Sequence, residues 1–179
     1  MFKLIKKIFT KTKESYGVVM LRLNFDINLY ELQLMIYKRD LYTEVDDDSY
    51  GLAKDPHVTL LYGIHDTVSD QLIKDTLILS KFRRVWLHNV SLFENDKFDV
   101  LKFDVEDPTI TKINSDLSTL PHTNEFGVYK PHVTIAYLKP GMGKKYVNRF
   151  KSNEYWSAPL YATYLDSKNN ETIIDIDVI

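Results

Sequence analysis

Two short segments of the chain each carry a histidine and a threonine separated by a single residue. Residues 56–63 read Pro-His-Val-Thr-Leu-Leu-Tyr-Gly and residues 131–138 read Pro-His-Val-Thr-Ile-Ala-Tyr-Leu, so five of the eight positions are identical. Both segments are rich in β-branched and aromatic residues, which is typical of a strand. Each begins with proline, which a strand tolerates at its end because no backbone donor is needed there. Repeats this far apart indicate two halves of one fold rather than the turns of a solenoid.

The alternation of side chains along a strand would place each histidine beside its threonine. We expect His57 and Thr59 to share one face of the first strand, and His132 and Thr134 to share one face of the second. The opposite faces would form an apolar layer, made of Val58, Leu60 and Tyr62 in the first copy and of Val133, Ile135 and Tyr137 in the second.

Two imidazole–hydroxyl pairs that face one small cavity would supply the groups needed to cleave a phosphodiester. One imidazole can remove a proton from the attacking oxygen, and the other can protonate the leaving oxygen. The two hydroxyls can hold the phosphoryl oxygens as charge develops on them. The sequence does not determine which histidine is the base.

The histidines have two other interpretations, a role in the core and a zinc site. A single histidine in an apolar strand is commonly a core residue, but the chain has only 5 histidines, and two of them stand in matching octapeptides. A zinc site would need further ligands, and the sequence has no cysteine and no His-Glu-x-x-His helix. We therefore expect no metal and no cofactor.

The two His-x-Thr strands resemble those of the 2H phosphoesterases, which include RNA-ligase-like and cyclic-phosphodiesterase enzymes. Within that superfamily the chain looks most like the bacteriophage anti-CBASS nucleases, which cut the cyclic di- and trinucleotide messengers of bacterial antiviral signalling. The narrower resemblance depends on residues 16–20, Tyr-Gly-Val-Val-Met, and on Trp86, which follows the first histidine by about thirty residues. The resemblance implies an α+β fold of two similar lobes, each with an antiparallel sheet and outer helices, around a central groove.

The same resemblance implies a metal-independent phosphodiesterase that cleaves 3′–5′ linkages of cyclic oligonucleotides and so lets a phage evade immunity. His57, Thr59, His132 and Thr134 would be its catalytic residues. Tyr16 and Trp86 would stack on bases, although ordinary core packing is the alternative for both. An enzyme that processes 2′,3′-cyclic ends of RNA, and a non-catalytic sponge that sequesters a nucleotide, are the competing functions.

Length and charge limit the partners. A chain of 179 residues suits a single domain, here residues 16–179, preceded by a basic helix or tail over residues 1–15. The 23 basic and 25 acidic residues give no global basic field, so we expect a small nucleotide rather than long nucleic acid as the ligand. No stretch is long and apolar enough to span a bilayer, and we expect no stable membrane association. The resemblance implies a cytoplasmic location, that of the host bacterium if a phage encodes the protein.

Hydrophobic periodicity and turn residues predict the remaining elements. A strand is expected first, followed by a helix and an acidic loop that would be solvated rather than metal-binding. After the first motif we expect a helix with Leu72, Ile73, Thr76 and Leu77 facing the core, then a hairpin and a further helix. The ranges are strand 16–25, helix 28–41, loop 46–48, a helix from 69, hairpin strands 84–94 and 97–106, a helix from 107, helix 144–151 and hairpin strands 157–166 and 171–178.

Overall fold

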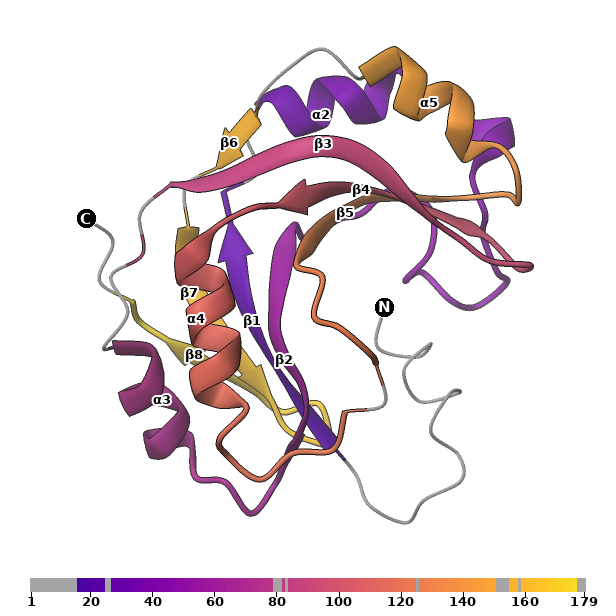
Figure 1. Cartoon of the computed structure of the whole chain (residues 1–179). Coiled ribbons are helices and arrows are strands. Elements are labelled where there is room, and N and C mark those ends of the chain that lie inside the picture. Colours follow the sequence, from indigo (N-terminus) through magenta and orange to yellow (C-terminus); the bar gives the residue numbers. More distant parts are fainter. Residues whose placement is uncertain are drawn as a thin grey trace.

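The computed structural model describes residues 16–24, 27–78, 82, 84–124, 126–150, 155–157 and 159–176. Within them the chain forms two four-stranded antiparallel sheets with helices on their outer sides (Figure 1), which confirms the expected α+β fold of two lobes. The expected basic segment at residues 1–15 lies outside the described residues. Among those residues, no helix has the length and apolar character required to cross a membrane.

The first sheet has the order β2-β1-β7-β8 and the second has the order β5-β4-β3-β6. The strands of the first sheet are β1 (Tyr16–Leu23), β2 (His57–His65), β7 (Pro159–Leu165) and β8 (Glu171–Ile174). Those of the second are β3 (Val85–Glu94), β4 (Asp99–Val105), β5 (His132–Leu138) and β6 (Tyr155–Ser157). The two motif strands, β2 and β5, are therefore each an edge strand, and they lie next to each other at the junction of the sheets (Figure 1).

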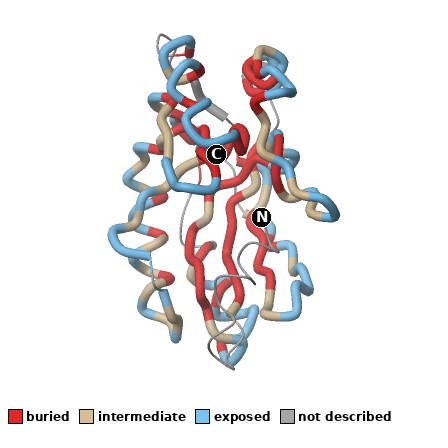
Figure 2. The backbone as a smooth tube through the Cα atoms, turned by 90° about the vertical axis from the view of Figure 1, so that its right-hand side faces the viewer, coloured by how far each residue is buried: buried red, intermediate tan, exposed pale blue. Residues whose placement is uncertain are grey.

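Two of the helices pack against a strand of the sheet that does not precede them in the chain. Helix α2 (Ile27–Leu34) follows a strand of the first sheet but packs against β5 of the second. Helix α4 (Pro108–Leu117), which follows the second sheet's hairpin, packs against β2 of the first. The other two helices are α3 (Asp70–Ile78), beside α4, and α5 (Gly143–Phe150), against β3 and β4. One continuous apolar core thus joins the lobes, and buried backbone runs along the central strands in Figure 2.

Each motif strand is also covered at its open edge by the loop that precedes the other motif. Before β2, Ala53 donates its backbone N–H to Ile135 of β5 at 3.0 Å. Before β5, Thr123 donates its backbone N–H to Gly63 of β2 at 2.8 Å. The Gln33 side chain reinforces the first contact by donating to both the Ala53 and Ile135 carbonyls. Because unpaired strand edges would otherwise be exposed, these reciprocal contacts lock the two motifs together.

Three expectations about the elements need correction. The C-terminal hairpin exists, but residues 157–166 are not one strand, because the chain leaves the second sheet after β6 and enters the first at β7. The helix expected over residues 28–41 ends at Leu34, and a separate 3-10 turn covers Lys38–Asp40. Leu72 was wrongly placed on the buried side of α3, where it is 45% exposed, because that short helix buries a narrower stripe containing Ile73 and Leu77.

Candidate active site

The two motif strands present their polar side chains on the faces that line the groove between the sheets. In β2, His57 lies opposite Arg22 of β1, and Thr59 lies opposite Met20. Because directly opposed residues share a face of the sheet, Arg22 stands beside the first imidazole. The expected pairing of each histidine with its threonine on one face agrees with this register.

The corresponding positions of the second sheet carry different partners. In β5, His132 lies opposite Asp104 of β4, and Thr134 lies opposite Lys102. The repeat therefore places equivalent histidines next to unlike charges, a cation in the first sheet and a carboxylate in the second.

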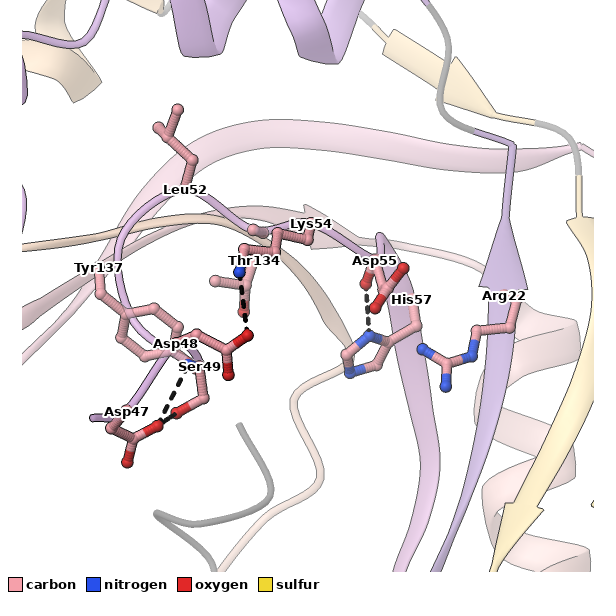
Figure 3. A pocket seen from close by; sticks show the side chains of 11 residues that line it. Arg22, Asp47, Asp48, Ser49, Leu52, Lys54, Asp55, His57, Thr134 and Tyr137 are labelled. Carbon is pink, nitrogen blue, oxygen red and sulfur yellow. Dashed lines mark hydrogen bonds and ion pairs between the residues drawn. The ribbon is translucent and has the colours of Figure 1, made fainter. Parts of the chain in front are cut away.

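A cavity of about 340 Å³ opens between the two sheets (Figure 3). His57 comes to it from the first sheet, while Thr134 and Tyr137 come from the second. Its other charged lining residues are Arg22, Asp47, Asp48, Lys54 and Asp55. The volume suits a nucleotide-sized group, and the lining contains both a proton acceptor and a hydroxyl.

Both site histidines are held in the same tautomer by the same local contact. Nδ1 of His57 lies 2.8 Å from the carbonyl oxygen of Asp55, and Nδ1 of His132 lies 2.9 Å from that of Lys130. A carbonyl oxygen can only accept, so Nδ1 must carry the proton in each ring. In the neutral imidazole this leaves Nε2 with a free lone pair, as a general base requires.

His57 is the more deeply buried of the two. Its Nε2 is, within the described residues, one of two buried side-chain polar atoms without a hydrogen-bond partner, the other being the Thr163 hydroxyl oxygen. The pKa of His57 is lowered to about 4, mainly by burial, and the positive charges of Arg22 and His132 contribute to this lowering. A buried acceptor without a partner costs free energy in the folded state, so its retention on a cavity wall points to a ligand there.

His132 is half-buried and has a different environment. The rings of His132 and Phe93 are nearly perpendicular, with centroids 4.9 Å apart. The Lys102 ammonium lies over the Phe93 ring, 4.2 Å from its centroid. The Lys102 ammonium is buried and donates to Asp104 and, at 2.6 Å, to the Ser91 hydroxyl. Burial lowers the pKa of His132, and Lys102 adds to this effect while Asp104 opposes it.

The expectation that Tyr62 and Tyr137 point away from the histidines is wrong. The register skips Leu60 between the partners of Met20 and Val19, and it skips Ile135 between the partners of Lys102 and Leu101. Each skipped residue is a β-bulge, which shifts the alternation of all later residues by one.

As a result, both tyrosines return to the groove face. Tyr137 lines the cavity together with Thr134, and burial raises its pKa to about 12. Tyr62 joins an apolar cluster on the first sheet with Val18, Met20 and Leu165. Identity of the tyrosine between the two octapeptides was the signal that could have identified it as a groove residue.

The other predicted site residues, Thr59, Tyr16 and Trp86, do not line the cavity. Thr59 is half-buried, and its carbonyl oxygen accepts a hydrogen bond from the Tyr129 hydroxyl at 2.8 Å. Tyr16 lies at the far end of β1, stacked on His65 with centroids 5.2 Å apart. Six residues separate Tyr16 from Arg22, which corresponds to about 20 Å along a strand. The structure therefore brings Tyr16 onto the groove face but not to the cavity that contains His57.

Trp86 lies on the groove face of the second sheet. Its neighbour Leu87 pairs with the core residue Val105, so Trp86 and Asp104 share the opposite face. The indole is 49% exposed, which leaves a flat aromatic surface accessible on the face that carries His132. Its role in stacking on a base stays a prediction.

The acidic loop was expected to be solvated, and it is so only in part. Asp48 is exposed and forms an ion pair with Lys54 at 3.1 Å, while Asp47 accepts two hydrogen bonds from Ser49. Asp47 and Asp48 nevertheless line the cavity beside His57, which sequence patterns did not indicate. Within the described ranges, no three histidine, aspartate or glutamate side chains are grouped in a way that could hold a metal ion.

Comparisons with known proteins agree with this architecture. No family model and no curated protein matches the sequence. Solved structures do match, among them Usb1 from Kluyveromyces marxianus, with a TM-score of 0.56 and 11% identity over 90% of this chain and 98% of that one. A second structure of the same protein, with uridine monophosphate, gives a TM-score of 0.57 at 12% identity, with the same coverage of 90% and 98%.

LigT from Escherichia coli complexed with 3′-AMP also matches, with a TM-score of 0.51 and 10% identity over 91% of this chain and 97% of that one. The chain thus has the 2H phosphoesterase fold of Usb1 and LigT. At these identities the similarity concerns the fold, and the chemistry of this chain must be argued from its own residues.

Proposed function

We propose that this protein is a phosphodiesterase that cleaves 3′–5′ linkages of cyclic di- or trinucleotides without a metal ion. The observation that carries the proposal is the buried Nε2 of His57, which lines the cavity without a hydrogen-bond partner. A second imidazole in the same tautomer lies close enough to lower the pKa of the first. His57 lines the nucleotide-sized cavity, whereas His132, on β5, is not part of its lining. Transfer at phosphorus requires one acceptor and one donor of protons, and the two imidazoles can supply them.

The reaction would be an attack by the 2′-hydroxyl of a ribose on its neighbouring phosphorus. One histidine accepts the proton of the 2′-hydroxyl as the bond from the 2′-oxygen to phosphorus forms. The other histidine gives a proton to the 5′-oxygen as its bond to phosphorus breaks. The product is a linear nucleotide with a 2′,3′-cyclic phosphate and a free 5′-hydroxyl, so atoms and charge balance without water or a cofactor.

The hydroxyls and the nearby cation would stabilise the charge that develops on the phosphoryl oxygens. Thr134 lines the cavity with His57, and Thr59 lies on the same face of β2. The Arg22 guanidinium lies beside His57 and lines the same cavity (Figure 3). Donors held in place before the reaction contribute most to stabilising such charge.

The choice of a cyclic oligonucleotide, and of a role in phage evasion of immunity within the bacterial cytoplasm, depends on the resemblance to anti-CBASS nucleases. The balanced charge of the chain and the size of the cavity support a small nucleotide. The fold neighbours solved with uridine monophosphate and 3′-AMP support a second candidate, an enzyme that processes RNA ends. A nucleotide sponge is the third.

Incubation of the protein with a 3′–5′ cyclic dinucleotide in EDTA, followed by chromatography and mass spectrometry, separates these functions. We expect a linear product eighteen mass units, one water, below the hydrolysed dinucleotide, and no product from the all-2′-deoxy compound, which lacks the nucleophile. A lowered free concentration without product would indicate a sponge. Cleavage of RNA with no action on the cyclic compound would favour the RNA-processing enzyme.

Variants of three histidines provide the matched controls. His57→Ala and His132→Ala should each lower turnover by about 10²-fold or more, the usual contribution of a general acid or base. His122→Ala should retain turnover, although its Nδ1 makes the same contact, 2.9 Å from the Leu120 carbonyl oxygen, outside the cavity. Full activity in either of the first two variants would rule out the two-histidine mechanism.

A further inference from the structure

The two histidines are equivalent in the repeat but not in their surroundings. Across the strands, His57 lies opposite the guanidinium of Arg22, whereas His132 lies opposite the carboxylate of Asp104. Their backbone contacts are the same, because each Nδ1 donates to a carbonyl oxygen two residues earlier. The difference between the two imidazoles therefore arises from side chains that the repeat does not share.

We propose that these cross-strand neighbours divide the catalytic roles between the histidines. His57, beside a cation, is the general base that accepts the 2′-hydroxyl proton. His132, beside a carboxylate, is the general acid that protonates the leaving 5′-oxygen. This inference rests on the proposed transfer reaction and adds to it the direction in which the proton moves.

The surroundings of His57 favour its neutral form. Arg22 is its immediate neighbour on β1, and the guanidinium is largely buried. Arg22 also pairs with Glu171 at 2.9 Å, but Glu171 belongs to β8, on the side of β1 away from β2. The Arg22 charge is among those that lower the pKa of His57, so it acts on the imidazole as a positive neighbour. A positive neighbour disfavours protonation of an imidazole.

Other charged groups face His57 more weakly or oppose one another. Asp55 precedes it in the same loop and favours protonation, while His132 of β5 disfavours it. Asp47, Asp48 and Lys54 line the same cavity, and two of these, Asp48 and Lys54, are paired with each other. Burial remains the main reason for the low pKa of His57, and Arg22 acts in the same direction.

The surroundings of His132 can accommodate a proton more easily. Lys102 of β4 disfavours the imidazolium, and Asp104, which faces His132 from the same strand, favours it to a smaller extent. Because Lys102 and Asp104 are ion-paired, their fields at the imidazole oppose each other. His57 faces it from β2 and is neutral over most of the working range, and β3 contributes the uncharged ring of Phe93. His132 is also the less buried, so water and the anionic phosphodiester can stabilise its charge.

A leaving group that needs no proton separates the two roles. In uridylyl-(3′–5′)-uridine the leaving group is the 5′-oxygen of the second uridine, a poor leaving group that requires a general acid. In uridine 3′-(4-nitrophenyl phosphate) the leaving group is 4-nitrophenolate, which is stable without a proton and requires none. His132→Ala should lose about 10²-fold or more on the dinucleotide but less than about 10-fold on the aryl ester. His57→Ala should lose about 10²-fold or more on both, because both need the 2′-hydroxyl activated.

The outcomes bear separately on the two proposals. A wild-type protein that cleaves both esters, with aryl-ester activity retained in His57→Ala and lost in His132→Ala, would overturn the division of roles alone. A wild-type protein that cleaves neither of these esters nor the 3′–5′ cyclic dinucleotide would overturn the proposed function and the division with it. The limbs of a pH–rate profile cannot assign the roles, because the lower and higher pKa shape the bell in the same way whichever group is the base.

Titration of each imidazole by NMR tests the tuning without any substrate. Arg22→Gln should raise the pKa of His57 and leave that of His132 in place, and Arg22→Lys should restore the low value. Asp104→Asn should lower the pKa of His132 and leave that of His57 in place. If either substitution shifted the pKa values of both histidines, or of neither, these neighbours would not distinguish the two imidazoles.

Discussion

Leu60 in β2 and Ile135 in β5 occupy equivalent β-bulges, each three residues after the histidine of its strand. Both side chains are fully buried, and so are Leu61 and Ala136, which follow them. Two consecutive residues on each strand thus face the core, which an unbroken alternation does not allow. The bulge is what turns the next residue, the tyrosine, back toward the groove.

Removal of the Tyr137 hydroxyl should therefore affect catalysis. Tyr137 lines the cavity, and a hydrogen bond from Thr134 to its oxygen partly offsets the effect of burial on its pKa. We expect Tyr137→Phe to lower kcat/KM by about 3- to 10-fold, which corresponds to the net value of one hydrogen bond. Tyr62→Phe is the matched control at the equivalent position, where the ring packs in an apolar cluster, and should change kcat/KM less. An equal effect of both changes would contradict the asymmetry of the groove.

The two threonines should contribute unequally for a similar reason. Thr134 is buried, at 8% exposed, and lines the cavity, whereas Thr59 is half-buried and outside its lining. We expect Thr134→Val to cost roughly 1–3 kcal/mol of transition-state stabilisation, measured from kcat/KM, and Thr59→Val to cost less. Thr134→Ser keeps the hydroxyl and should restore most of the activity. Unchanged kcat/KM in Thr134→Val would leave this residue a packing role alone.

Sequence patterns placed each histidine on the same face as its threonine, because residues two apart share a face whenever no bulge intervenes between them. His57 and Thr59 satisfy that condition, as do His132 and Thr134. The bulges were not predictable, since Leu60 and Ile135 are ordinary aliphatic strand residues without any local signal.

The sequence also could not predict which strands belong to the same sheet, for a different reason. Strand periodicity reports which residues are buried, but not which strand lies alongside. The division of residues 157–166 between β6 and β7, and the packing of α2 on β5, depend on contacts distant in sequence. The positions of Arg22 and Asp104 beside the histidines were also not predictable, because they depend on the cross-strand register.

Gly63, in β2, should tolerate substitution less well than Gly141, which follows β5. It has a φ of +88°, and a Cβ atom there would come within 1.7 Å of the Thr123 carbonyl oxygen, in the contact that covers β2. Gly141 has a similar φ of +77° but nothing within 4 Å of its Cβ position. We expect Gly141→Ala to lower the free energy of unfolding by about 1 kcal/mol, the cost of the backbone conformation alone. Gly63→Ala should lower it by several times as much, as measured by urea denaturation, because the backbone of residue 123 must also move. Equal losses in the two variants would mean that the loop yields freely and does not hold the strands together.

The stability of the protein should depend on the protonation of His57. Its pKa lies near 4 in the folded protein and near 6.5 when it is exposed on unfolding. Between these values the unfolded state binds more protons than the folded state, so stability falls as pH decreases from 6.5 to 4 and is unaffected by this group above 6.5. A difference of this size corresponds to at most about 3 kcal/mol. We expect His57→Gln to remove that part of the pH dependence, seen as a flatter curve of the free energy of unfolding between pH 6.5 and 4. If His57→Gln followed the wild-type curve throughout that range, the imidazole would titrate at an ordinary pKa in the folded protein, and burial would not keep it neutral for its role as a base.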